Sequence, residues 1–443
     1  MGTEREFWSF DGTEHHRGTS ERPRDRDELF RIARAAPALI AQGSRLSYCA
    51  ASAGAGVTSI DLSAFDRILE LDAVQGEVVV EPGLRLGNLL EKLVPAGWWL
   101  PPLPGHPTIT LGGCLGCNVH GKSQFHDGDF SDYVVDLTLF HPDHGEIVCS
   151  REREAELFWL TVGGFGLTGI VTRLRLRLLP LPTTSVSIER VSCRDVFDAV
   201  ERMRSSAANA DLLYSWNDFA ATGRRFGRGF VYVERRTDEA ADPPPSGFRS
   251  IGPEWRRSAL LDALPTIALR AIPVAYRLRE TLRPRRRTVH ILEAAFPVSG
   301  NEIYFRLFGT RGLREYQILI PFDAWEATLR ELASLCASAA TPVTLGSLKL
   351  FRGEERLLHF RGEGVCLTID CPATPSSRRF FERLDELAIR SGSIANLSKD
   401  SRLGAATAQR MYRGYARFRD GLLRWDPAAR FQSSLRTRLG LDA

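Results

Sequence analysis

The feature that most constrains this sequence is the run 101–122, in which prolines and glycines are mixed with small side chains (PPLPGHPTITLGGCLGCNVHGK). Residues of this kind do not continue a helix, and so long a run inside a compact domain is usually a functional loop. A glycine-rich backbone offers N–H groups to an anion such as a pyrophosphate, and His120 and Lys122 add side-chain donors beside it. We therefore predict that 101–122 is a loop that binds a phosphate-containing ligand.

The length and composition indicate an ordinary folded protein. At roughly 150 residues per domain, 443 residues allow two or three domains. The 43% hydrophobic and 25% charged fractions exclude fibrous and wholly disordered classes, and a net charge of +4 is too small for a dedicated nucleic-acid binder. The first residues lack the apolar run of a secretory signal, and the eight cysteines are mostly isolated. These features predict a cytoplasmic protein with reduced thiols.

Several segments carry clear secondary-structure patterns. Residues 86–94 have the apolar spacing of an amphipathic helix, and the apolar runs 134–140 and 146–148 predict a hairpin. Alternating arginine and apolar residues over 170–180 predict a strand with one wet face. A helix that stops at Gly392 is predicted to bury one face, made of the apolar residues Phe380, Phe381, Leu384, Leu387 and Ala388. A further helix is expected after it, with Tyr412, Tyr415 and Phe418.

Three short motifs favour structural explanations. Gly164-x-Gly166-x-x-Gly169 precedes a strand rather than a helix, so it is not a Rossmann fingerprint, and close backbone approach to a ligand or another strand explains it better. Cys114-x-x-Cys117 lacks a second pair of ligands, which predicts no metal site and favours small residues in a crowded loop. His141 and His144 lie in a predicted turn and are expected to be solvated.

Residues 256–287 combine nine arginines with many apolar residues, in a chain that has only four lysines. Apolar side chains beside cations suit a membrane surface or a lipid carrier, and the prolines at 265, 273 and 284 predict an irregular or kinked element. The alternative is a disordered insert with a solvated basic end.

The order of several motifs along the chain resembles a known family. GSRLSY (43–48), the 101–122 run, AELFWLTVGGFGLTGIVTRLRL (155–176) and SKDSR (398–402) are similar to FAD-linked oxidoreductases with a PCMH-type FAD-binding domain, and most similar to the decaprenylphosphoryl-β-D-ribose 2-oxidase group. Between them, YSWND, FRLFGTRGLREYQ, LKLF and TIDCP match in the same order, so the resemblance covers about 30–435. It implies an α+β, two-domain, vanillyl-alcohol-oxidase-like fold with an FAD domain (1–182), an α+β substrate domain (183–395) and a C-terminal segment (396–443) that completes the FAD domain.

The resemblance also implies which residues hold FAD. The first pyrophosphate loop corresponds to Gly43, Ser44, Arg45, Leu46, Ser47 and Tyr48, and the second to Gly105, Thr110, Leu111, Gly112, Gly113, Cys117, Asn118, Val119 and His120. Ile170 matches an adenine-side contact, Asn396 takes a place often held by tyrosine, and Lys399 matches the lysine that faces the pyrimidine edge of the flavin. Related oxidases tether FAD through a histidine of the first loop, but Tyr48 stands in this loop without a histidine, which predicts non-covalent FAD.

For substrate and chemistry, the resemblance implies Lys122, Tyr304, Gln317, Lys349 and Thr368 on the substrate side. Lys399 would stabilise reduced flavin, and either Tyr48 or His120 would be the base that removes a hydroxyl proton. Thr368 stands where actinobacterial members carry cysteine, and Cys366 lies two positions earlier. The substrate of those members is therefore not carried over directly.

The expected function is oxidation of a secondary hydroxyl of a sugar or polyprenyl-phospho-sugar to a ketone, as in the first half of an epimerisation with an NAD-dependent keto-sugar reductase as partner. An aldonolactone or alditol oxidase and a flavin-dependent double-bond reductase are the enzymatic alternatives. A non-catalytic flavoprotein that docks on a membrane through 256–287 is a third. No nucleic-acid partner is expected, and the protein is placed in the cytoplasm or peripherally at a membrane.

Overall fold

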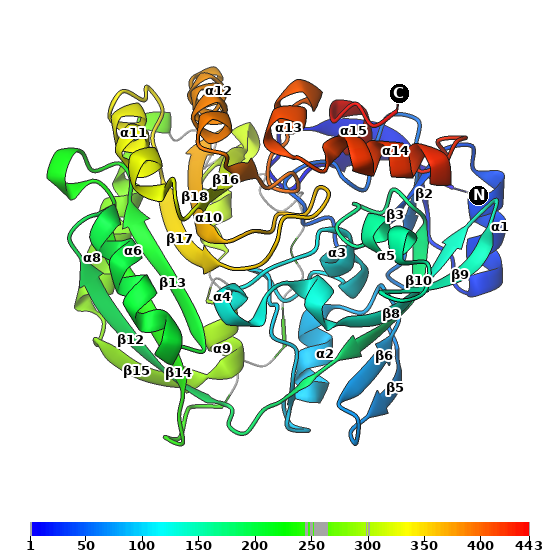
Figure 1. Ribbon diagram of the computed structural model, residues 1–443, viewed down its shortest axis with the longest axis horizontal. Coiled ribbons are helices and arrows are strands. Elements are labelled where there is room, and N and C mark those ends of the chain that lie inside the picture. Colours follow the sequence, from blue (N-terminus) through cyan, green and yellow to red (C-terminus); the bar gives the residue numbers. More distant parts are fainter. Residues whose placement is uncertain are drawn as a thin grey trace.

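The computed structural model describes residues 2–243, 247–248, 251, 265–297, 299 and 302–442. Two small sheets form the right-hand part of the molecule in Figure 1, and a large sheet forms the left-hand part. The first small sheet has the order β1-β2-β4-β3, in which β4 runs parallel to both β2 and β3. Its elements are β1 (Thr3–Trp8), β2 (His15–Glu21), α1 (Arg26–Ala35), β3 (Leu39–Gln42) and β4 (Thr58–Asp61).

The second small sheet is antiparallel, with the order β5-β6-β10-β8-β9. Its strands are β5 (Ile68–Asp72), β6 (Glu77–Val80), β8 (Val134–His141), β9 (Gly145–Ser150) and β10 (Ile170–Arg177). The predicted hairpin is β8–β9, and β10 buries its leucines while Arg173 pairs with Asp136. The prediction of a solvated His141 is wrong: this side chain is buried at the end of β8, with Nε2 3.6 Å from the Asp426 carboxylate.

The predicted loop 101–122 contains a short helix, α3 (Leu111–Gly116). The Thr110 hydroxyl caps this helix by accepting a hydrogen bond from the Gly113 N–H, and burial of its leucines and Cys114 holds it against the core. Packing thus overrides the low helix propensity of glycine here. The other elements of this part are α2 (Leu86–Leu93), as predicted, β7 (Trp98–Trp99), α4 (Gln124–Asp127), η1 (Phe130–Tyr133), α5 (Ala155–Thr161) and β11 (Leu179–Pro180).

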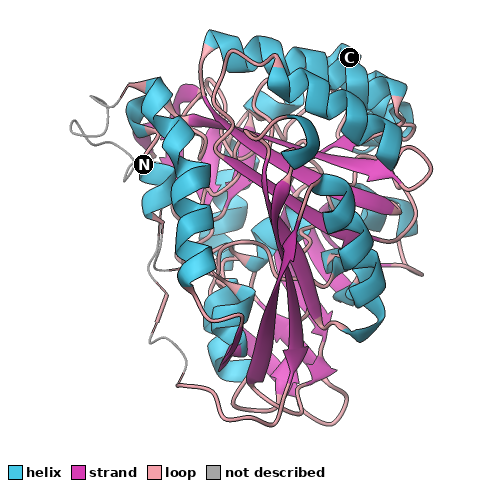
Figure 2. Cartoon of the chain, turned by 90° about the vertical axis from the view of Figure 1, so that its left-hand side faces the viewer, coloured by secondary structure: helices cyan, strands magenta, loops and turns pink. Residues whose placement is uncertain are grey.

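The large sheet has eight strands in the order β15-β12-β14-β13-β17-β18-β16-β19, all in antiparallel pairs. The strands are β12 (Ser185–Cys193), β13 (Leu212–Asp218), β14 (Arg228–Arg236), β15 (Arg286–His290), β16 (Leu313–Pro321), β17 (Leu345–Phe351), β18 (Gly364–Pro372) and β19 (Ile394–Ala395). Figure 2 shows helices on both sides of this sheet.

One face of the large sheet packs on α6 (Val196–Ser206), α11 (Trp325–Ala337) and α12 (Pro375–Arg390) in a single hydrophobic core. The predicted apolar face of 375–391 is the buried face of α12. The opposite sheet face shares a second core with β6, β8 and β10, so it is directed at the small sheets. The connecting helices are η2 (Ala207–Asn209), η3 (Gly223–Arg225), η5 (Thr266–Arg270), α8 (Ala271–Leu282), α9 (Ile291–Ala295), α10 (Ile303–Arg306) and η6 (Gly309–Arg311).

After β19 the chain returns to the first small sheet. It forms α13 (Ala405–Met411), α14 (Tyr415–Trp425) and α15 (Ser434–Arg438), and Phe431 bridges to Leu39 of β3. The prediction of one helix here is wrong, since Tyr412 falls between two helices. Among the described residues, no helix is both long and apolar enough to cross a membrane.

Candidate active site

A cavity of about 430 Å³ lies between the large sheet and the small sheets. Its walls come from segments far apart in sequence: residues 41–52, 103–122 and 161–171 on one side, and β13, β16, β17, β18 and 396–399 on the other. The cavity therefore joins the glycine-rich run, the 43–48 loop and the SKDSR segment into one site.

Most of the residues expected to bind FAD line this cavity. They are Gly43, Ser44, Arg45, Leu46, Ser47, Tyr48, Gly105, Thr110, Gly112, Gly113, Cys117, Val119, His120, Asn396 and Lys399. Three others lie behind the wall: Leu111 and Ile170 are fully buried in hydrophobic cores, and Asn118 accepts a hydrogen bond from the Ser131 N–H at 2.8 Å. The neighbours of Ile170, Gly169 and Val171, line the cavity in its place.

Glycines let the cavity loops pack closely. A Cβ on Gly43 would lie 2.1 Å from the Thr110 hydroxyl oxygen, and one on Gly121 would lie 2.7 Å from the Leu103 carbonyl oxygen. A Cβ on Gly169 would likewise lie 2.8 Å from the Phe140 carbonyl oxygen of β8, so this glycine makes the close approach to another strand expected for its motif. The glycines of this wall carry no side chain that would keep a ligand from the backbone, which suits the pyrophosphate of a dinucleotide, so these loops fit FAD.

Gln317 is the centre of a hydrogen-bond network on the opposite wall. Strand pairing sets Gln317 of β16 opposite Thr368 of β18, and its Nε2 donates to the Thr368 hydroxyl at 3.0 Å. Its Oε1 accepts from Asn396 Nδ2 at 2.7 Å and lies 3.3 Å from His120 Nε2. Asn396 in turn accepts from the Ser398 hydroxyl, at 2.8 Å. The network joins predicted cofactor and substrate residues.

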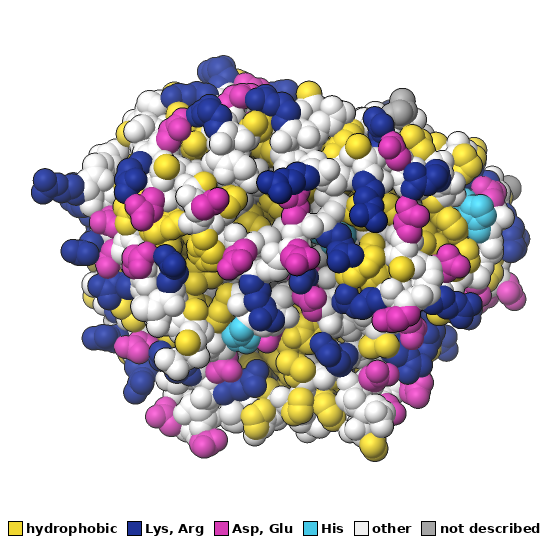
Figure 3. Space-filling view, in the orientation of Figure 1, with side chains coloured by type: hydrophobic (Ala, Val, Ile, Leu, Met, Phe, Trp, Pro, Cys, Tyr) yellow, Lys and Arg dark blue, Asp and Glu magenta, His cyan; other side chains and the backbone are white. Residues whose placement is uncertain are grey.

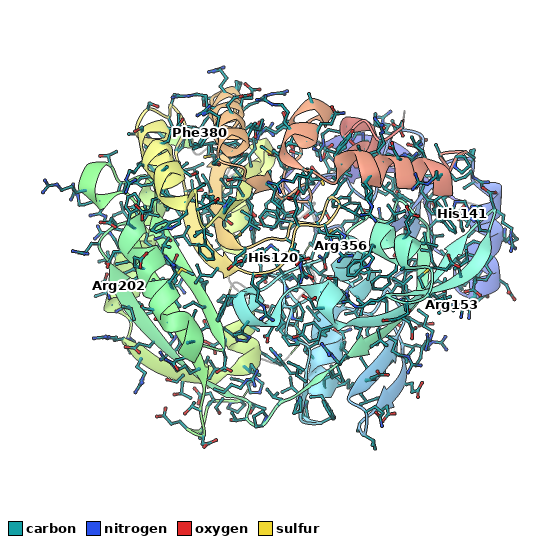
Figure 4. The ribbon with its side chains drawn as sticks, viewed as in Figure 1. His120, His141, Arg153, Arg202, Arg356 and Phe380 are labelled. Atoms are coloured by element: carbon teal, nitrogen blue, oxygen red, sulfur yellow. The ribbon has the colours of Figure 1, made fainter. Side chains whose placement is uncertain are left out.

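His120 is held neutral by its surroundings. Burial, followed by the nearby Lys349 ammonium, lowers the pKa of His120 well below its usual value. Because Gln317 Oε1 is an acceptor, the His120 proton belongs on Nε2, and Nδ1 keeps a lone pair with no partner among the described residues. The phenyl rings of Phe351 and Phe360 pack against the imidazole, and Figure 4 shows His120 at the centre of the molecule.

Lys399 lies between an aromatic ring and a carboxylate. Its Nζ is 3.9 Å from the centre of the Tyr48 ring and 3.3 Å from Glu315 Oε1. Glu315 is almost fully buried, on the same face of β16 as Gln317, and also lines the cavity. The ion pair holds the Lys399 ammonium at the cavity wall.

The other two predicted cavity lysines differ in their partners. Lys122 Nζ pairs with the buried Glu234 carboxylate at 3.1 Å, donates to the Ala294 carbonyl and lies 4.1 Å from the Tyr214 ring centre. Lys349, on β17, makes no ion pair with any described residue, and burial lowers its pKa. Lys349 therefore has N–H donors to offer a ligand, whereas the charge of Lys122 is already balanced.

Tyr304 also lines the cavity, as expected, and its hydroxyl donates to Asp370 Oδ2 at 2.8 Å. Sequence reasoning missed the acidic partners Glu234, Glu315 and Asp370. Each is a carboxylate in a strand of the large sheet that is mostly buried, where a charge needs a partner, and that placement was the available signal.

Comparison with known proteins matches residues 21–150 to the FAD binding domain family. The decaprenylphosphoryl-beta-D-ribose oxidase of Mycolicibacterium smegmatis is 27% identical over 91% of this chain and 89% of its own length. An uncharacterised protein of Streptomyces coelicolor is 29% identical over 81% of this chain and its full length. The D-lactate dehydrogenase of Anaerostipes hadrus is 32% identical, over 31% of this chain and 30% of its own.

The protein is an FAD-dependent oxidoreductase. The matched domain contains both loops expected to hold the FAD pyrophosphate, and the α+β PCMH-type fold of the oxidoreductase is confirmed. Its resemblance to the decaprenylphosphoryl-ribose oxidase group extends over the large sheet as well, because the alignment covers nine-tenths of the chain.

Proposed function

We propose that the oxidoreductase converts a secondary hydroxyl of a sugar or polyprenyl-phospho-sugar to a ketone. The observation that carries this proposal is the cavity itself, in which the Gln317 network and the unpaired Lys349 face the loops that fit FAD. When bound, FAD supplies the hydride acceptor. The ketone is then a substrate for an NAD-dependent keto-sugar reductase, which would complete an epimerisation.

Six residues of the cavity have a defined role in this proposal. Gln317 and Thr368 orient hydroxyl oxygens, and Lys349 donates to a hydroxyl or phosphate oxygen of the substrate. His120 is available as a base at Nδ1 because its ring is neutral, while Tyr48 remains the alternative base. Lys399 supplies a positive charge, and the nearby Glu315 carboxylate partly offsets it.

We further propose that FAD is bound without a covalent link. The Gly43–Tyr48 loop contains no histidine. Two histidines line the cavity and both lie outside this loop: His106 contacts Thr108 and Glu302, and His120 contacts Gln317 through Nε2. Denaturation by acid should therefore release all the flavin into the supernatant, and flavin that stays with the precipitate contradicts this proposal.

The test of the function is anaerobic reduction of the bound FAD by candidate substrates. We expect the visible flavin absorbance to bleach with polyprenyl-phospho-ribose or a related phospho-sugar. Bleaching by an aldonolactone or alditol alone would identify the lactone or alditol oxidase alternative. A flavin that bleaches with none of them, but that an activated double bond reoxidises after anaerobic reduction by dithionite, would identify a reductase.

A further inference from the structure

Exposed apolar side chains are concentrated in one region of the described surface. Eight large apolar residues are exposed among the described residues, and five of them lie between residues 267 and 303: Ile267, Val274, Leu278, Leu282 and Ile303. The other three, Leu69, Leu71 and Val74, lie at the β5–β6 hairpin. Contiguous exposed apolar surface of this kind marks an interaction site more often than chance exposure.

Helix α8 contains three of these five exposed apolar residues. Val274, Leu278 and Leu282 are spaced by four residues, which places them on one helical face, and 53–78% of each side chain is exposed. Arg277 and Arg279 flank Leu278 on either side of this stripe. The helix is continuous through Pro273, where a break was predicted, because this proline lies in the first turn, where a missing N–H removes no helical bond. Pro265 and Pro284 lie outside the helical segment, where the predicted breaks occur. Residues 256–264 of the predicted segment lie outside the described residues.

The opposite face of α8 is fixed to the protein. The Tyr276 ring stacks on Trp216 of β13 at 4.6 Å, and buried Glu280 accepts a hydrogen bond from the Tyr232 hydroxyl at 3.0 Å. Leu269 and Ile272, just before and within α8, belong to the same hydrophobic cluster as Tyr48, Tyr304 and Phe305 of the cavity wall. The exposed stripe is therefore a rigid surface beside the cavity.

We propose that the α8 face, formed by Val274, Leu278 and Leu282 with Arg270, Arg277 and Arg279, docks on an anionic lipid bilayer. The inference goes beyond the proposed reaction and does not depend on it. Arg270, Arg277 and Arg279 make no ion pair with any described residue, so their charge is free to meet lipid phosphates. A second copy of the chain is the poorer occupant, because a symmetric contact would set these arginines against one another. The visible face in Figure 3, by contrast, intersperses acidic and basic side chains.

The test is co-sedimentation of the FAD-loaded full chain with vesicles. We expect recovery with vesicles of equal parts phosphatidylglycerol and phosphatidylcholine, little recovery with phosphatidylcholine alone, and loss between about 0.1 M and about 1 M salt, over which the Debye length falls to roughly 3 Å. The variant Val274→Ser/Leu278→Ser/Leu282→Ser should bind more than tenfold more weakly. Arg277→Gln/Arg279→Gln should weaken binding roughly 30-fold.

A matched control replaces the same number of exposed apolar residues elsewhere, as Leu69→Ser/Leu71→Ser/Val74→Ser. This variant should bind like the unaltered protein, while all variants keep their flavin spectrum. Equal recovery with neutral and anionic vesicles, or full binding by the α8 variant, would overturn the proposal. Light scattering that shows a dimer lost only in the α8 variant, without vesicle binding, would assign the face to self-association instead.

Discussion

The charge next to the flavin site depends on two side chains that are remote in sequence. Lys399 contributes a cation, and Glu315 returns a negative charge 3.3 Å from it. In the proposed function Lys399 faces the flavin, where a cation stabilises the negative charge of the reduced form and a carboxylate opposes it. The net charge near the site therefore depends on both residues, and a substitution of either one changes that charge in a known direction.

Lys399→Ala should slow flavin reduction by substrate while the fold stays intact. Removal of one such electrostatic donor typically costs about 2.7–4 kcal/mol, or roughly 10²–10³ in rate. Stopped-flow bleaching measures this rate, and the exposed Lys92→Ala is the matched control. Reduction at the unaltered rate by a folded Lys399→Ala protein would exclude Lys399 from the mechanism.

Glu315→Gln should raise the flavin reduction potential, because it removes a negative charge and keeps the size of the side chain. A tenfold shift in the ratio of reduced to oxidised flavin corresponds to about 30 mV for a two-electron couple. Spectroscopic titration against a reference dye gives the potential without any substrate. An unchanged or lowered potential would show that Glu315 does not oppose the reduced state.

At the scale of elements, the glycine-rich run shows what a sequence can and cannot specify. Its composition predicted a loop that binds a phosphate-containing ligand, and the run does line the cavity, but α3 inside it depends on burial of Leu111, Cys114 and Leu115 by distant segments. The same limit applies to Glu315, because only strand pairing brings β16 beside residues 396–399. Local periodicity predicted α2, β10 and α12, whereas long-range contacts decide the rest.

Gly121→Ala should disturb the segment that carries His120 and Lys122. The added methyl would lie 2.7 Å from the Leu103 carbonyl oxygen and 2.9 Å from the Leu103 nitrogen, and these backbone atoms leave little room to adjust. Overpacking of this kind costs about 1–3 kcal/mol, so FAD should dissociate more readily and the melting temperature should fall. Gly404→Ala, where a Cβ meets no atom within 4 Å, is the control and should retain FAD.

At the scale of the whole molecule, a buried imidazole links stability to pH. His359 is packed against Gly163 and near Trp159, and burial lowers its pKa to about 4. Between that value and the ordinary value of about 6.5, the unfolded chain binds a proton that the folded chain does not, so stability falls as pH falls through this window.

The expected loss from His359 is about 2 kcal/mol in the free energy of unfolding between pH 7 and pH 5. Urea unfolding at the two pH values measures it. His359→Gln should flatten the dependence by that amount, whereas His144→Gln, at an exposed position, should leave it unchanged. The same slope in the protein and in His359→Gln would contradict the burial of a neutral ring.

The two sides of the cavity are also synthesised at different times. The Gly43–Tyr48 loop is made early, yet the Asn396 and Lys399 side chains that close the cavity come some 350 residues later in the sequence. At a synthesis rate of roughly 5–20 residues per second, the early loop leaves the ribosome tens of seconds before residues 396–399 are made. FAD can therefore contact both walls of the cavity only late in biosynthesis, and until then the nascent chain has to keep the first wall folded without the cofactor.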